Sequence, residues 1–70
     1  MPLSFASEGA TNCILYITGE DTTRRHLENL GFVAGESVTV VSNHGGNMIL
    51  SIKDTRIALD RKIVNRIIVN

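Results

Sequence analysis

Short apolar runs, separated by glycines and polar clusters, recur along the whole chain. Residues 13–18 form a continuous run of apolar and β-branched side chains between Gly9 and Gly19, which predicts the first long strand. Because the run is continuous, alternation does not assign its inward face. Ahead of it, Leu3 and Phe5 alternate with less apolar positions and predict a short edge segment of a sheet.

One segment has the periodicity of a helix instead of a strand. Residues 21–30 repeat apolar or β-branched side chains at spacings of four and three, at Thr23, Leu27 and Leu30. This spacing predicts an amphipathic helix with a narrow apolar stripe. The positions on its solvated side are Arg24, Arg25 and Glu28.

Both ends of this helix carry sequence signals. Asp21 or Thr22 is predicted to cap the first turn, because either side chain can accept hydrogen bonds from the free amides there. Gly31 is predicted to end the helix in the left-handed conformation. Phe32 follows at the place where a hydrophobic contact closes such an end.

The second half of the chain is predicted to consist of strands and tight turns. Residues 33–36 are typical of a type II turn, with Gly35 at the third position. Residues 43–47 predict a hairpin loop, and residues 54–55 predict a tight return. Strands are predicted at residues 38–41, 48–53, 56–60 and 67–69, with one helical turn at residues 61–65.

These elements predict a single domain over residues 1–70 with a mostly β fold. The turns between consecutive strands are too short for crossover connections, so the sheet is expected to be antiparallel. Five or six short strands in so small a chain close most readily into a small barrel, which leaves few exposed edges. The predicted fold class is therefore a small antiparallel barrel with one short inserted α-helix.

Charge and composition narrow the functional classes. Seven basic residues balance seven acidic ones, which gives a net charge of zero, whereas nucleic-acid binding depends on an excess of positive charge. The aromatic side chains Phe5, Tyr16 and Phe32 are too few for a base-stacking surface. A small RNA-binding barrel therefore ranks last among the functions considered, and no nucleic-acid partner is expected.

The sequence also indicates a cellular compartment. No apolar run approaches the roughly 20 residues that span a bilayer, so no direct membrane insertion is expected. The N-terminus lacks the basic and apolar regions of a secretory signal. Cys13 is the only cysteine, which excludes an internal disulfide and fits a reducing compartment. We therefore expect a cytoplasmic protein.

Candidate catalytic and metal-binding side chains are scattered. Cys13, His26 and His44 have no spacing that suggests a nucleophile with its base, so the chain is not expected to be an enzyme. Metal sites cluster their ligands at short spacing, whereas His26 and His44 lie on different predicted elements without flanking ligands. They are the metal candidates of this sequence, for Fe(II) or another divalent transition metal, but a surface position is favoured for each and no cofactor is certain.

A block of spaced residues runs from the helix into the next strand: Arg24, Leu27, Leu30, Gly31, Phe32, Gly35, Val38 and Val40. Its spacing resembles the pattern R-x-x-L-x-x-L-G-[FLM]-x-P-G-x-x-V-x-V of the ferrous iron transport protein A (FeoA) family. Ala58 and Leu59 match the end of a later family strand. The departures are Ala34 where the family often has proline and Asp54 where it often has glycine.

The resemblance covers essentially the whole chain and implies an SH3-like barrel with an inserted helix. It implies an accessory role in bacterial ferrous iron uptake beside FeoB, a membrane transporter with a cytoplasmic GTP-binding domain. The same barrel is similar to the C-terminal domain of metal-dependent repressors of the diphtheria-toxin-repressor type, which implies transition metal ion binding.

The alternative function is therefore a stand-alone metal-responsive regulatory barrel. A repressor module is expected to follow a helix-turn-helix domain, for which a chain that starts at Met1 leaves no room, so the transport role is favoured.

The expected surface for a FeoB-like partner is the corner where the helix meets the following turn. Arg24, Arg25 and Glu28 form its charged ridge, Val33 lies at its apolar edge, and His44 is expected to contribute from the hairpin loop. Arginine is a frequent anchor of protein interfaces, whereas most apolar side chains of this corner are expected in the core. A homodimer is also compatible with the sequence.

Overall fold

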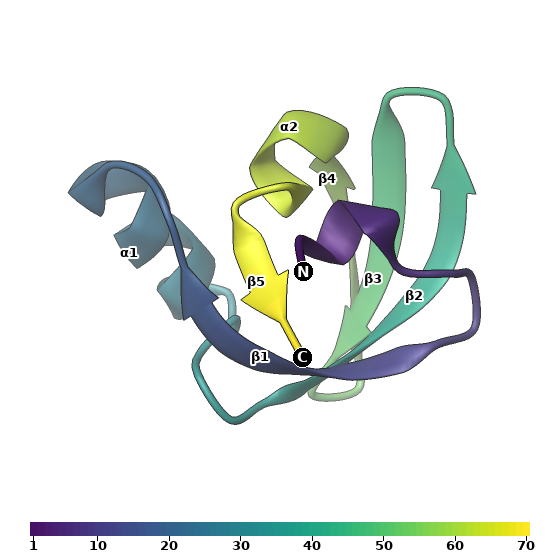
Figure 1. The fold of residues 1–70 in the computed structure, drawn as a ribbon, viewed down its shortest axis with the longest axis horizontal. Helices are drawn as coiled ribbons and strands as arrows, with labels where there is room; N and C mark the ends of the chain where they lie inside the picture. The colour runs from purple at the N-terminus through teal and green to yellow at the C-terminus, as the bar shows by residue number, and fades with distance from the viewer.

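The strands form one antiparallel sheet that curls around the interior, with the two chain ends close together (Figure 1). The computed structural model describes residues 1–70. The predicted mostly β architecture with one inserted helix is confirmed. In chain order the elements are the 3-10 turn η1 (Leu3–Phe5), β1 (Thr11–Ile17), α1 (Asp21–Asn29), β2 (Ser37–His44), β3 (Asn47–Ile52), β4 (Thr55–Asp60), α2 (Arg61–Val64) and β5 (Ile67–Val69).

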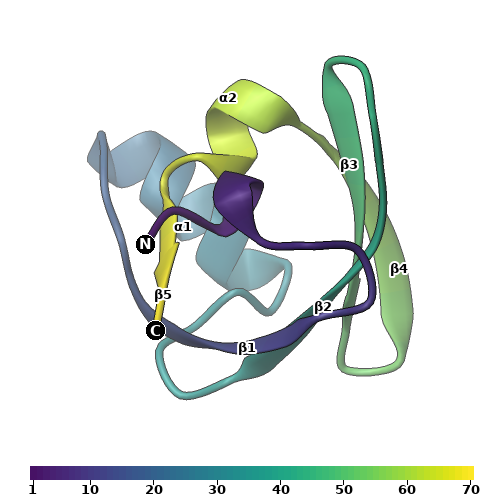
Figure 2. The ribbon, with the colours of Figure 1, turned by 45° about the vertical axis from the view of Figure 1, so that its right-hand side comes forward.

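The sheet has the strand order β4-β3-β2-β1-β5, so β4 and β5 are its two ends. β2 joins the two halves, because its first residues pair with β1 and most of its length pairs with β3. The register between β2 and β3 shifts between Val40 and Ser42. A bulge of this kind bends a strand and increases its twist, so β2 can pass from one half of the sheet to the other (Figure 2).

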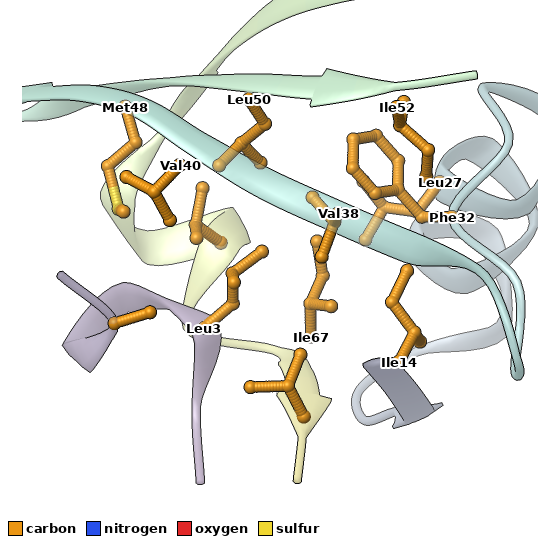
Figure 3. Packing of buried hydrophobic residues seen from close by; sticks show 13 residues of the cluster. Leu3, Ile14, Leu27, Phe32, Val38, Val40, Met48, Leu50, Ile52 and Ile67 are labelled. Atoms are coloured by element: carbon orange, nitrogen blue, oxygen red, sulfur yellow. The ribbon is translucent and has the colours of Figure 1, made fainter. Parts of the chain in front are cut away.

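Thirteen buried hydrophobic side chains fill the space inside the curled sheet (Figure 3). Leu27 and Phe32 are each 0% exposed, which confirms that apolar side chains of the helix-to-turn corner lie in the core. Val38 and Val40 of β2 are also 0% exposed. Leu30 packs against this cluster in a half-buried position. Burial of a side chain the size of Phe32 contributes roughly 1.5–3 kcal/mol, so this interior holds the inner side of α1 against the sheet.

The C-terminal end of α1 follows the prediction closely. Gly31 has a φ of +108°. Its N–H donates to the Glu28 carbonyl at 3.0 Å, and the N–H of the buried Phe32 donates to the Leu27 carbonyl at 3.0 Å. This is the Schellman pair of bonds, which satisfies carbonyls that the helix itself leaves free.

The predicted cap at the N-terminal end of α1, by Asp21 or Thr22, is wrong. The N-cap residue is Glu20, whose backbone is extended and whose side chain makes no capping hydrogen bond. Asp21 is already the first helical residue, and its carboxylate accepts a hydrogen bond from Arg24 at 2.7 Å instead. An acidic side chain in the first turn still stabilises the helix through its dipole.

The predicted turn after α1 is confirmed, and both later hairpins differ from the prediction. Gly35 has a φ of +91°, and the N–H of Glu36 donates to the Val33 carbonyl at 3.1 Å. The return between β3 and β4 is made by Lys53 and Asp54, whose φ values are +49° and +62°. The expected return at residues 54–55 is thus one residue off.

The hairpin between β2 and β3 is tighter than the predicted loop over residues 43–47. β2 continues to His44 and β3 begins at Asn47, which leaves two glycines for the reversal. The Glu8 carboxylate accepts the backbone N–H of Asn43 at 2.7 Å. Arg61 donates to the Asn43 side-chain oxygen. These long-range contacts extend the strand beyond what its polar composition predicts.

The predicted edge segment at the N-terminus is wrong, because residues Leu3–Phe5 form a 3-10 turn. Leu3 and Ser4 are both buried, whereas Phe5 is exposed. A strand places neighbouring side chains on opposite faces, so it does not produce this pattern. The Ser4 hydroxyl donates to the Asn65 side-chain oxygen at 2.7 Å and anchors the turn beside α2.

The first two residues lie along the outer edge of β5. Pro2 forms an antiparallel bridge with Ile68. The Met1 ammonium donates to the Val69 carbonyl at 2.6 Å, and the N–H of Val69 donates to the Met1 carbonyl at 2.8 Å. This end of the sheet is therefore covered by the chain itself.

Candidate partner-binding surface

The outer face of α1 carries the charged side chains that the sequence predicts there. Arg25, His26 and Glu28 are exposed. On the opposite side of the same helix, Leu27 is 0% exposed and contacts the core (Figure 3). Because one side of the helix is fixed by packing, the polar side chains project from a defined position.

Arg24 differs from Arg25 in its surroundings. Its guanidinium donates to the Asp21 carboxylate at 2.7 Å, and the two side chains are 39% and 68% exposed. A solvent-exposed pair one helical turn apart contributes only about 0.3–0.5 kcal/mol. The pair therefore orients Arg24 along the helix without adding much stability, and Arg25 forms neither of the two ion pairs within the chain.

The apolar side chains of the corner next to α1 lie mostly in or against the core, as the sequence predicts. Phe32 is fully buried, and Leu30 and Val33 are half-buried. Val33 lies in the turn after the helix, where its N–H donates to the Gly31 carbonyl at 2.9 Å. Only a rim of apolar surface therefore borders the charged face of the helix.

The approach of Lys53 to this corner was not predicted from the sequence. Lys53 lies in the turn between β3 and β4, and its Nζ atom is 3.7 Å from the Oε1 atom of Glu36. The Lys53 side chain also passes close to Gly31. A Cβ atom added to Gly31 would lie 3.6 Å from the Cδ atom of Lys53. The curl of the sheet brings this turn to the end of α1, and no local sequence signal indicates the contact.

His44 does not lie with the other predicted partner-binding residues. It is exposed at the end of β2, next to the β2–β3 turn. In Figures 1 and 2 this turn lies on the opposite side of the molecule from α1. The structure therefore brings together Arg24, Arg25, Glu28 and Val33 around α1 and places His44 elsewhere.

The two metal candidates are separated in the same way, because His26 lies on α1 and His44 on the distant hairpin. No three side chains of the His, Cys, Asp or Glu type are close enough to hold a metal ion together. Structural metal sites in proteins use about four ligands. The residues present thus do not fit a metal site built within one copy of the chain.

A second exposed surface lies on β1, at Leu15 and Tyr16, and was also not predicted. Tyr16 is 57% exposed and pairs with Ile68 of β5, which in turn bridges Pro2. The register between β1 and β5 shifts between Ile14 and Tyr16. Because residues 13–18 form a continuous apolar run, the sequence did not indicate which of their side chains face outward.

None of the helices has the length and apolar character needed to cross a membrane.

Comparisons with known proteins place the chain in a family context. The FeoA domain family matches residues 1–70. No curated protein matches the sequence significantly. A crystal structure of an iron uptake regulatory protein, FeoA, is 25% identical with a TM-score of 0.93, and the match covers 100% of this chain and 95% of that one.

Two further solved structures extend the comparison. The zinc complex of FeoA from Stenotrophomonas maltophilia, described as an SH3 domain protein, is 28% identical with a TM-score of 0.90, and the match covers 100% of this chain and 89% of that one. A manganese-dependent transcriptional repressor bound to manganese is 16% identical with a TM-score of 0.91, and the match covers 100% of this chain and 35% of that one. At that identity the match to the repressor shows a shared fold alone. It does not support the regulatory function that the sequence left as the alternative.

The predicted family resemblance and the SH3-like fold are both confirmed by these matches. The helix-to-turn block that carried the resemblance also has the predicted structure, from the end of α1 through Gly35 into β2. The match over the full sequence shows that the chain belongs to the FeoA domain family.

Proposed function

We propose that this chain is a small cytoplasmic accessory protein of ferrous iron uptake, which binds the cytoplasmic GTP-binding region of a FeoB-like membrane transporter. Family membership supports the transport role. One similar structure is described as an iron uptake regulatory protein, and the S. maltophilia protein as a candidate ferrous iron transport activating factor. The proposed activity is binding to a protein partner and not catalysis.

The observation that carries this proposal is the way in which α1 is held. Leu27 and the bonds around Gly31 fix the helix from beneath and at its end, while Arg25 and Glu28 stay exposed. A surface whose side chains are already positioned loses less entropy on binding than a flexible one. The charged face of α1 is therefore partly ordered before a partner binds.

Each residue of this surface has a distinct proposed role. Arg25 is the anchor, because a guanidinium can form two parallel hydrogen bonds with a carboxylate of the partner. Arg24 is oriented by Asp21 and supplies a second positive charge. Glu28 requires a positive charge on the partner at the facing position. Val33 provides apolar contact at the rim of this surface. His44 lies outside this surface and is not part of the proposed contact.

The metal-binding role expected from the family resemblance is not included in the proposed mechanism. His26 and His44 lie apart, and the chain holds no cluster of metal-ligand side chains. Zinc is bound to the similar FeoA from S. maltophilia, and manganese is bound to the similar transcriptional repressor. The proposal therefore needs no metal step.

Calorimetric titration of the detergent-solubilised transporter with the purified chain tests this proposal. The wild type is expected to bind, and R25E is expected to bind at least about tenfold more weakly, a loss of about 1.4 kcal/mol. R56E makes the same charge change on β4 and is the matched control, which we expect to bind like the wild type. Absence of binding by the wild type would refute the proposed function, and equal binding by R25E would refute the proposed surface.

A further inference from the structure

We propose that the free edge of β4 pairs with the same edge of a second copy of this chain, which gives a symmetric antiparallel dimer with one continuous sheet. The inference goes beyond the proposed function and does not depend on it. β4 stands at one end of the sheet, with β3 as its only strand neighbour. Figure 2 shows β4 at the outer border of the molecule.

The register of the β3–β4 hairpin determines which backbone groups face away from β3. Ile52 and Thr55 flank the two-residue turn and pair with each other. In such a hairpin the flanking pair exchanges backbone hydrogen bonds, and bonded and non-bonded pairs then alternate. The N–H and C=O groups of Arg56 and Ala58, and the N–H of Asp60, therefore point outward and are available to another strand.

The side chains along β4 are self-complementary about Ala58. Arg56, Ala58 and Asp60 are exposed on one face of the strand. When two copies of β4 pair antiparallel with Ala58 opposite Ala58, Arg56 of each copy lies opposite Asp60 of the other. Opposite charges in directly facing positions stabilise a strand pair, and like charges destabilise it. Neither Arg56 nor Asp60 belongs to the two ion pairs within the chain.

The inward face of β4 supports the same register. Ile57 and Leu59 are half-buried and pack against the core of their own copy. With Ala58 at the centre, Ile57 of one copy lies opposite Leu59 of the other. These are pairs in which the side chains approach most closely, so the dimer extends the apolar interior across its two-fold axis.

Other registers of the same edge are disfavoured by charge. Pairing about Arg56 places two guanidinium groups opposite each other, and pairing about Asp60 does the same with two carboxylates. A parallel pairing in register also faces like charges. Specificity of this kind depends on penalties in the wrong arrangements as much as on gains in the right one. The charges of β4 therefore select one self-pairing.

The expected dimer is weak, because β4 contributes only six residues from each copy. Interfaces below about 1,200 Å² are typical of transient complexes. Sedimentation velocity over a wide range of protein concentration is therefore the appropriate measurement. A reducing buffer prevents cross-linking through Cys13, which is half-buried.

The wild type is expected to shift from monomer to dimer as the concentration rises. R56E places a carboxylate opposite Asp60 of the second copy and is expected to weaken association at least tenfold. R25E makes the same charge change on α1 and is expected to associate like the wild type. A58P removes an outward N–H at an edge position where proline is tolerated, and gives a second disruption that does not depend on charge.

A mixture of two variants tests the register itself. R56E alone and D60R alone each face like charges across the proposed axis, whereas one copy of each restores two opposite pairs. The mixture is expected to form a heterodimer. Because Asp60 accepts the N–H of Lys62 and caps α2, circular dichroism must first show that D60R is folded. If D60R is unfolded, A58P and R56E decide the question.

Three outcomes would overturn the proposal. The wild type could remain a monomer at every concentration. A dimer could form and resist both R56E and A58P, which would place the interface elsewhere. The amide signals of β4 could shift only when an extended peptide of another protein is added, which would make this edge a docking site for a different chain.

Discussion

The two ends of the sheet are completed in different ways. At β5, Met1 and Pro2 lie along the outer edge and take up its free hydrogen-bonding groups. At β4, no strand of the chain lies along the outer edge, and Arg56 and Asp60 are exposed near the two ends of the strand. Proteins cover or charge exposed edges to prevent uncontrolled pairing. The covered edge contributes to the stability of the fold, whereas the open edge is available to a second molecule.

The largest effect on stability is expected when Leu3 is truncated, because this side chain anchors the N-terminal segment that covers the edge of β5. Leu3 is 0% exposed within the core cluster and holds the N-terminal turn in place. L3A removes apolar contacts and leaves a cavity, so we expect the free energy of unfolding to fall by about 2–5 kcal/mol. Urea denaturation followed by circular dichroism measures this loss.

F5A is the matched control for L3A, because Phe5 belongs to the same turn and is 73% exposed. Truncation of a surface side chain usually changes stability by less than about 0.5 kcal/mol. Similar losses in L3A and F5A would show that the cover of β5 does not depend on the buried anchor.

A smaller effect is expected at the polar contact that ties the same segment to α2. The Ser4 hydroxyl donates to the Asn65 side chain at 2.7 Å, and Ser4 is 5% exposed. S4A removes this hydrogen bond and is expected to lower the free energy of unfolding by about 1 kcal/mol. S7A, at an exposed serine nearby, is expected to have no measurable effect in the same denaturation experiment. An S4A variant as stable as the wild type would contradict the role given to this bond.

The smallest effect is expected at the turn that leads into the open edge. Asp54 has a φ of +62°, a conformation that glycine adopts without steric cost. D54G is expected to stabilise the chain by a few tenths to about 1 kcal/mol, and D54A, which retains the steric cost, is expected to destabilise it. Thermal unfolding of the two variants and the wild type gives the order of their stabilities directly. Equal melting temperatures would show that the turn is not strained.

Local sequence signals predicted the elements whose structure depends on neighbouring residues. The end of α1 at Gly31 and the turn at Gly35 require positive φ values that few other residues adopt, so the glycines alone indicate them. The strand predicted at residues 48–53 likewise agrees with β3, in which Met48, Leu50 and Ile52 are buried. In these places the local preference and the tertiary structure agree.

Two of the errors occur where distant residues decide the local structure. Asn43 remains in β2 because Glu8 and Arg61, which are remote in the sequence, bind its backbone and side chain. The N-terminal turn forms because Ser4 contacts Asn65 near the other end of the chain. Propensity and alternation do not include such contacts, so the sequence predicted a loop in one place and a strand in the other.

The candidate surface was predictable in part for the same reason. Helical spacing is sufficient to place Arg25 and Glu28 on the solvent side of α1 and Leu27 on the inner side. The distance between α1 and His44, and the approach of Lys53 to the end of the helix, depend on how the sheet curls. Residues on one element could thus be grouped from the sequence, whereas residues on different elements could not.

Nuclear magnetic resonance can distinguish the two proposed surfaces in one experiment. The isotope-labelled chain, at a concentration low enough to be monomeric, would be titrated with the cytoplasmic GTP-binding region of the FeoB-like transporter. We expect the amide signals of α1, including Arg25 and Glu28, to shift while those of Arg56 and Ala58 stay in place. No shift at saturating partner concentration, or shifts confined to β4, would contradict the proposed role of the helix.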